Sequence, residues 1–145
     1  MTPMRILSHH EDDTIKAAQD LASDLKPGDV LFLHGNLGAG KSVFARALIR
    51  ALAGDKNLEV PSPTFTLVQT YDTPTGPVHH YDLYRLTQTD EIYELGWEDS
   101  LSQAITIVEW PERLGTLAPH RRLDIRITSI KNEPDSRDIE IIRPD

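Results

Sequence analysis

The segment Gly35–Ser42 reads GNLGAGKS and matches the pattern G-x-x-x-x-G-K-[ST] at every fixed position. It follows a short apolar run, Val30–Leu33, and precedes a stretch whose apolar residues recur at helical spacing. Glycines let successive backbone N–H groups turn inward around phosphate oxygens, and the start of a helix adds the positive end of its dipole. The segment, called the phosphate loop below, therefore predicts a strand–loop–helix unit that binds phosphate, and it favours an α/β fold.

The residue types in the phosphate loop predict separate tasks. Four small residues are expected to surround the nucleotide phosphates with their backbone: Gly35, Gly38, Ala39 and Gly40. Lys41 would neutralise the β- and γ-phosphates, and the hydroxyl of Ser42 would ligate Mg²⁺, which takes few protein ligands and keeps several waters. The sequence has no Asn-Lys-x-Asp motif for reading guanine, so ATP is expected rather than GTP.

Length and composition predict a single folded domain over residues 1–145. Hydrophobic residues make up 39% of the chain and charged residues 26%, which is ordinary for a globular protein. Neither an internal repeat nor a plausible linker interrupts the sequence. The expected unit is one ATPase domain built around the phosphate loop.

The apolar pattern predicts a mixed sheet between helices. A Ser-x-x-Glu capping box at Ser8 and Glu11 predicts the start of a helix that ends near Leu25. Continuous apolar runs at Val30–Leu33 and Ala104–Val108 are typical of strands buried on both faces. The other predicted elements are a helix from Val43 to about Gly54, a hairpin of Phe65–Tyr71 with Val78–Tyr84, a short helix Asp90–Leu95, and a hairpin of Leu123–Thr128 with Ile139–Ile141. We predict a three-layer α/β sandwich with a parallel core and antiparallel hairpins.

Two acidic residues are candidates for the metal and water chemistry that a phosphate loop needs. Glu109 ends the second buried run, where it could hold the metal or its waters, or be an ordinary surface glutamate. Asp82, in the first predicted hairpin, is its rival; the alternative is a structural or solvated aspartate. His80 shares a strand face with Asp82, an arrangement that could bind a transition metal, but no third ligand with suitable spacing is evident.

Two further residues flank these candidates. The two prolines of Pro61–Thr64 make the segment rigid, so Thr64 could present its hydroxyl to a γ-phosphate or to the metal, or belong to a bare turn. Trp110 follows Glu109 and could stack on a nucleobase; on sequence alone, packing in the core is the favoured interpretation.

Charge and composition exclude several classes of function. With 15 basic and 23 acidic residues the net charge is -8, which disfavours direct docking on DNA or RNA. The absence of cysteine removes disulfides, thiolate zinc sites and cysteine nucleophiles. No apolar stretch approaches the length of a membrane-spanning helix, and the early acidic residues do not fit an export signal. We expect a cytoplasmic protein without a membrane partner.

Four blocks in this order resemble one family. They are Gly35–Ser42, then Ser62–Val68 (SPTFTLV), His80–Leu86 (HYDLYRL) and Val108–Pro111 (VEWP). Together they look like the TsaE (YjeE) family of small bacterial ATPases. The likeness runs from about residue 8 to residue 111, and the last predicted hairpin has only a suitable size and pattern.

The resemblance implies a role in making threonylcarbamoyladenosine beside the anticodon of tRNA. In that family, TsaE proteins bind the TsaB and TsaD subunits, and TsaD attaches the threonylcarbamoyl group. ATP hydrolysis by TsaE then resets the complex between rounds, so activity is expected to depend on partners. The acidic charge of this chain fits a protein whose partners hold the tRNA.

The resemblance also implies roles for individual residues. By position, Lys41 and Ser42 handle phosphate and Mg²⁺, Glu109 completes the metal site, Asp82 serves hydrolysis, Thr64 takes the switch position, Trp110 lies near the nucleotide and Thr14 lies near its base. Asn36, Ser42 and Phe65 depart from the usual aspartate, threonine and tyrosine of the family. These departures concern positioning and rate, because serine still offers a hydroxyl to a metal.

The sequence leaves two other functions open. A small-molecule kinase could use the same loop with Asp82 as base, although no arginine-rich lid insertion is found. A non-catalytic nucleotide-binding adaptor would keep the loop and activate no water. Measured activity separates these functions.

Overall fold

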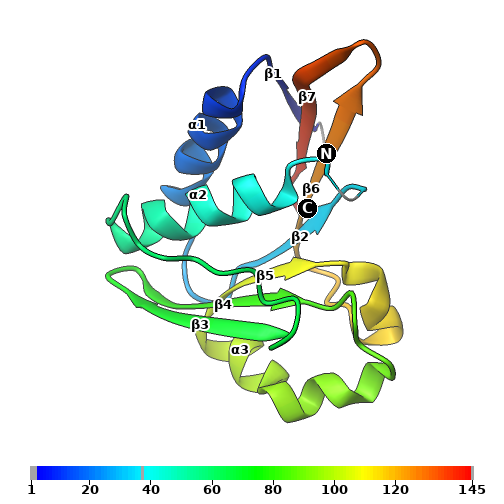
Figure 1. The fold of residues 1–145 in the computed structure, drawn as a ribbon. Coiled ribbons are helices and arrows are strands. Elements are labelled where there is room, and N and C mark those ends of the chain that lie inside the picture. Colours follow the sequence, from blue (N-terminus) through cyan, green and yellow to red (C-terminus); the bar gives the residue numbers. More distant parts are fainter. Residues whose placement is uncertain (1–2, 37, 145) are drawn as a thin grey trace.

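The fold is seen in a computed structural model that describes residues 3–36 and 38–144 (Figure 1). Leu37 of the phosphate loop and the outermost residues of the predicted domain lie outside the described residues. The elements in chain order are β1 (Met4–Ser8), α1 (Glu11–Ala22), β2 (Val30–His34), α2 (Lys41–Ala53), β3 (Val68–Thr73), β4 (Gly76–Asp82), η1 (Thr89–Leu95), α3 (Trp97–Gln103), β5 (Ile105–Glu109), η2 (Pro111–Leu117), β6 (Leu123–Ile130) and β7 (Glu133–Ile142). Among the described residues, no helix has both the length and the apolar character that crossing a membrane requires.

The described strands form one mixed sheet of seven strands in the order β1-β7-β6-β2-β5-β4-β3. Strand β2 lies at its centre and pairs in parallel with β5 and with β6, and β5 pairs in parallel with β4. The pairs β1–β7, β6–β7 and β3–β4 are antiparallel. The predicted parallel core with antiparallel hairpins is confirmed.

Helices cover both faces of the central strands, which gives the predicted three layers. On one face, Leu31 and Leu33 of β2 join a buried cluster with residues of α1 and α2. On the other face, Val30 and Phe32 pack in a second cluster that includes Ile92 of η1, Trp97 of α3 and Leu114 of η2. Figure 1 shows α1 and α2 on one side of the sheet and α3 on the other. The apolar run of β2 is therefore buried on both faces, as its sequence predicts.

The predicted start of the first helix is wrong. Ser8 ends β1, where it pairs with Arg137 of β7, and its hydroxyl donates to the carbonyl oxygen of His10 at 2.8 Å. Helix α1 begins at Glu11 without a side-chain cap at His10, and it ends at Ala22 rather than near Leu25. A short edge strand next to a helix has no strong periodic signal, so the serine that closes β1 resembled a cap.

The sequence predicts one of the three described helical segments between β4 and β6 and does not predict the other two, α3 and η2. The predicted helix Asp90–Leu95 is the 3₁₀ helix η1, and Gly96 ends it as expected. Helix α3 begins directly after this glycine. Gly96 therefore ends one helix and precedes another, and its sequence signal indicates only the end. Segment η2, which follows Trp110, was also missed.

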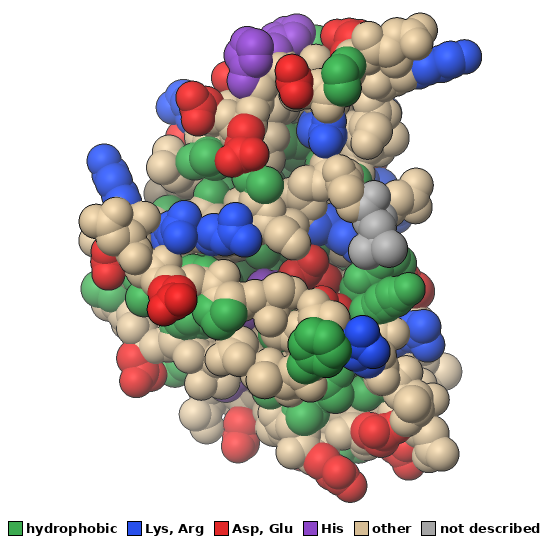
Figure 2. Space-filling view, viewed as in Figure 1, with side chains coloured by type: hydrophobic (Ala, Val, Ile, Leu, Met, Phe, Trp, Pro, Cys, Tyr) green, Lys and Arg blue, Asp and Glu red, His purple; other side chains and the backbone are tan. Residues whose placement is uncertain are grey.

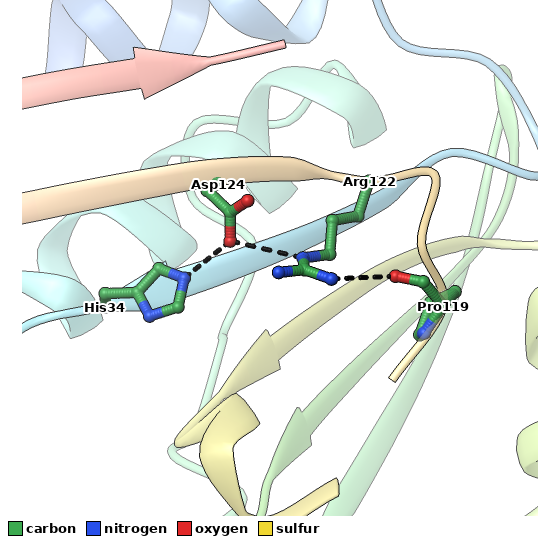
Figure 3. Close-up of polar contacts among 4 residues, drawn as sticks. All are labelled: His34, Pro119, Arg122 and Asp124. Atoms are coloured by element: carbon green, nitrogen blue, oxygen red, sulfur yellow. Dashed lines mark hydrogen bonds and ion pairs between the residues drawn. The ribbon is translucent and has the colours of Figure 1, made fainter. Parts of the chain in front are cut away.

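Both predicted hairpins are confirmed, and the second one lies inside the sheet. Strands β6 and β7, called the terminal hairpin below, are longer than the predicted runs, and β6 also pairs with β2. Side chains reinforce this pairing (Figure 3): His34 Nε2 lies 2.7 Å from Asp124 Oδ1, to which Arg122 Nε donates at 3.3 Å. Because His34 directly precedes the phosphate loop, the terminal hairpin is fixed beside that loop.

Candidate functional site

The phosphate loop connects the end of β2 to the start of α2, as predicted. Gly40 has a φ of 112°, a conformation that residues with a side chain rarely adopt. A Cβ atom on Gly35 would lie 2.7 Å from the carbonyl oxygen of Ile127 in β6. Helix α2 starts at Lys41 without a side-chain cap or an acidic residue in its first turn. The positive end of its dipole is therefore left for an anion.

Lys41 is buried at the start of α2 and lies against an aromatic ring. Its Nζ is 3.6 Å from the ring centroid of Trp110, whose ring lies 5.0 Å from that of Tyr84. Burial lowers the pKa of Lys41 below its ordinary value of 10.5, while Glu109, Glu112 and Asp82 act in the opposite direction. Trp110 also packs against the cluster beneath the sheet, so it contacts both the core and the site. On sequence alone, packing in the core is the favoured role of Trp110.

Glu109 is a buried carboxylate at the carboxyl end of β5. Parallel pairing places it opposite Leu33 of β2, two residues before the phosphate loop begins. The side chain of His80 reaches it from β4, with His80 Nε2 2.7 Å from Glu109 Oε2. Glu109 is only 5% exposed, which rules out the alternative of an ordinary surface glutamate.

Asp82 lies next to Glu109, because the two residues are paired across β4 and β5. Thr64 donates from Oγ1 to Asp82 Oδ2 at 3.3 Å, and the backbone N–H of Tyr84 donates to Oδ1 at 3.0 Å. Ser62 and Thr64 are joined by their hydroxyls at 2.7 Å. The rigid segment Pro61–Thr64 thus presents the predicted switch threonine to the predicted catalytic aspartate.

The structure therefore brings together residues that lie far apart in the sequence. Lys41, Glu109 and Asp82 come from α2, β5 and β4, and both carboxylates influence the pKa of the lysine. In Figure 2, acidic side chains are recessed near the middle of the face, next to basic ones. A cation and two carboxylates beside an uncapped helix start are suited to holding a polyphosphate with its metal.

The donor atoms present fit Mg²⁺. Ser42 is the exposed second residue of α2, and its hydroxyl together with the Glu109 carboxylate would supply hard oxygen ligands. Across residues 3–36 and 38–144, no group of three or more His, Cys, Asp or Glu could hold a metal ion. The possible His80–Asp82 transition-metal pair thus has no third ligand there, and His80 contacts Glu109 instead. A metal that completes its shell with phosphate and water suits this arrangement.

Thr14 of α1 lies close to the phosphate loop. It lines a pocket of about 170 Å³ together with Gly40 and Arg137, and its hydroxyl lies 2.8 Å from that of Ser8. The pocket therefore joins the start of α1, the end of the loop and the terminal hairpin.

Sequence reasoning missed two residues of this site. His80 was paired with Asp82 on one strand face, whereas its partner on the neighbouring strand is Glu109. Arg137 contacts the phosphate loop from the terminal hairpin, and the sequence alone does not place that hairpin beside the loop. Both contacts depend on which strands are neighbours in the sheet, so no local signal points to either of them.

A family model and several relatives indicate the same family. The family described as threonylcarbamoyl adenosine biosynthesis protein TsaE matches residues 8–139. A Rickettsia felis protein named tRNA threonylcarbamoyladenosine biosynthesis protein TsaE is 46% identical over 107 residues, which cover 74% of this chain and 62% of that protein. Proteins with the same name from Rickettsia bellii and Bacillus subtilis are 38% identical (92% of each chain) and 37% identical (80% and 72%). The crystal structure of Bacillus subtilis YdiB superposes with a TM-score of 0.78 at 28% identity, covering 99% of this chain and 87% of that one.

Proposed function

The chain belongs to the TsaE family, and we propose that it is a Mg²⁺-dependent ATPase subunit that takes part in forming threonylcarbamoyladenosine in tRNA. The ATPase part of the proposal rests on one observation. Lys41 lies at the start of α2, which has no side-chain cap, and the buried carboxylates Glu109 and Asp82 act on its pKa. This arrangement supplies a phosphate cradle, a metal-holding carboxylate and a second carboxylate for water.

The residues divide the work of hydrolysis. Loop amides and Lys41 Nζ hold the β- and γ-phosphates, with Nζ keeping the face of Trp110 on one side and donating to phosphate oxygens from the other. Ser42 and Glu109 would hold Mg²⁺, which neutralises phosphate charge when bound. The adenine base is assigned to the pocket beside Thr14.

Asp82 is assigned to the attacking water. The water oxygen bonds to the γ-phosphorus, the bond from that phosphorus to the bridging oxygen breaks, and a carboxylate oxygen of Asp82 holds the proton that the water loses. Thr64 already donates to Asp82 Oδ2, so its hydroxyl is placed to turn toward the γ-phosphate when a nucleotide is bound. Both roles follow from one contact between β4 and the Pro61–Thr64 segment.

Partners complete the proposed activity. The net charge of -8 makes this chain a poor binder of tRNA by itself, so homologues of TsaB and TsaD are proposed to hold the tRNA while this subunit hydrolyses ATP. We assign the protein to the cytoplasm, with no role on DNA or at a membrane.

Steady-state hydrolysis of ATP with Mg²⁺ tests the proposal, measured on the protein alone and with its TsaB–TsaD pair. Turnover that the pair stimulates and that Lys41→Ala abolishes is the expected result. Lys56→Ala is the matched control, because Lys56 is an exposed lysine beyond the end of α2. Tight ATP binding without turnover under either condition would favour the adaptor, and phosphoryl transfer to a small molecule without partners would favour the kinase.

A further inference from the structure

Arg137 of β7 contacts the phosphate loop from outside the predicted site. Its Nε donates to the carbonyl oxygen of Ala39 at 2.7 Å, and an Nη atom lies 3.3 Å from the carbonyl oxygen of Gly38. These two residues lie nearly one hundred positions earlier in the chain. In Figure 1 the terminal hairpin passes beside the start of α2, which agrees with this contact.

The same guanidinium is anchored in its own hairpin. Its other Nη atom donates to the carbonyl oxygens of Pro134 and Ser136, each at 2.8 Å. One side chain therefore binds four backbone carbonyls, two in the phosphate loop and two in the terminal hairpin. A planar guanidinium offers five donors in a fixed fork, so these contacts fix its orientation.

The terminal hairpin also packs closely on the loop with backbone and side-chain atoms. Ile127 of β6 leaves no room for a side chain at Gly35, and a Cβ on Gly40 would lie 3.8 Å from both Arg137 Nε and Ile127 Cγ2. The hairpin thus contacts both ends of the phosphate loop, and Arg137 binds two carbonyl oxygens of that loop.

The short contact to Ala39 determines where one amide points. In a trans peptide the C=O and the following N–H point to opposite sides. Arg137 binds Ala39 C=O from the side of the hairpin, so the N–H of Gly40 is directed away from the hairpin. The neighbouring N–H of Ala39 is already used, since it donates to the carbonyl oxygen of Asn36 at 3.0 Å. The Ala39–Gly40 peptide is therefore the part of the loop that Arg137 orients.

We propose that Arg137 is a positioning residue for nucleotide binding, which holds the Ala39–Gly40 peptide so that Gly40 N–H faces a phosphate oxygen before the nucleotide arrives. This role rests on the proposed function. A loop that is already oriented pays less ordering entropy when ligand binds. This gain in binding free energy is the same for the bound ground state and for the transition state. It therefore lowers KM and does not change kcat.

Calorimetric titration of MgADP into wild type, Arg137→Ala and Arg137→Lys tests this role. We expect about tenfold weaker binding by Arg137→Ala, because the Ala39–Gly40 peptide must then be ordered when the nucleotide binds, at roughly the cost of fixing one residue of backbone. Arg137→Lys keeps the positive charge but has only one donating nitrogen in place of three, so its affinity should lie between the two. Arg126→Ala is the matched control, because Arg126 is exposed on β6 and lies on the opposite face of the sheet from Ile125 and Ile127.

The outcomes separate this role from a structural one and from the proposed function. Support comes from weaker MgADP binding with an unchanged unfolding midpoint in the absence of nucleotide, and from a raised KM with kcat within about twofold of wild type. Wild-type affinity in Arg137→Ala overturns the role; if that variant does not fold, wild-type affinity in Arg137→Lys overturns it. Wild-type protein that binds no MgADP would refute the proposed function itself, and the role of Arg137 with it.

Discussion

Nε2 of His80 lies 2.7 Å from Oε2 of Glu109, and the two residues are 3% and 5% exposed. Within the described part of the chain, Nδ1 of His80 is buried without a hydrogen-bond partner. Donation from Nε2 gives this carboxylate oxygen of Glu109 a hydrogen-bond partner. The contact uses one carboxylate oxygen of Glu109, so His80 restricts the orientation of the proposed metal-holding group.

Replacing His80 with alanine should leave a buried carboxylate without its partner. We expect a loss of about 1–3 kcal/mol in the free energy of unfolding and a higher Mg²⁺ concentration at half-maximal enhancement of ADP binding. His80→Gln should recover part of both effects, because its amide can donate from nearly the same place. The measurements are urea denaturation and ADP titration at several Mg²⁺ concentrations, with exposed His120→Ala as control. An unchanged Mg²⁺ dependence in folded His80→Ala would contradict the role.

The ammonium of Lys41 should reduce the stability of the fold at neutral pH. Burial lowers the pKa of this lysine from 10.5, so between the lowered value and 10.5 the unfolded chain binds more protons than the folded one. Stability therefore rises with pH across that window, and the cost is fully present below it. We expect Lys41→Met to unfold at higher urea than wild type at pH 7, with a gap that narrows by pH 10.

The control for this measurement is Lys56→Met, which removes an exposed lysine and should show no such change with pH. A gap between wild type and Lys41→Met that stays constant from pH 7 to pH 10 would show that lost packing, not charge burial, causes the difference. Lys41→Met should also abolish ATP hydrolysis at every pH.

Local patterns were sufficient where one segment carries the whole signal. A few neighbouring residues are enough to predict three features: the phosphate loop, the strand before it that is buried on both faces, and Glu109 at the end of another apolar run. Arg137 and the His80–Glu109 contact depend on which strands are neighbours, a property of the whole sheet. Strand β1 escaped notice because it is a short, mostly exposed edge strand whose pairing with β7 is non-local.

Asp82→Asn should preserve nucleotide binding and lower turnover. The amide keeps an oxygen for the N–H of Tyr84, so the fold should survive, but it holds a proton poorly. General-base assistance contributes at least about a hundredfold, and a loss of that order in kcat is expected. Steady-state hydrolysis and ADP titration measure the two effects, with the exposed Asp90→Asn as control. Unfolding of Asp82→Asn would instead mark Asp82 as structural.

Trp110→Ala should weaken ATP binding, because the ring that lies 3.6 Å from Lys41 Nζ keeps the lysine at the phosphate site. Such cation–π contacts contribute about 0.5–2 kcal/mol, so affinity should fall by a few-fold up to about thirtyfold. Trp110→Phe keeps an aromatic face and should recover part of the loss. Trp97→Phe is the matched control: Trp97 is 2% exposed in the core away from Lys41, so this change should lower the unfolding midpoint and leave ATP affinity unchanged. If Trp110→Ala behaves like Trp97→Phe, with wild-type affinity and a lower midpoint, then Trp110 serves the core alone.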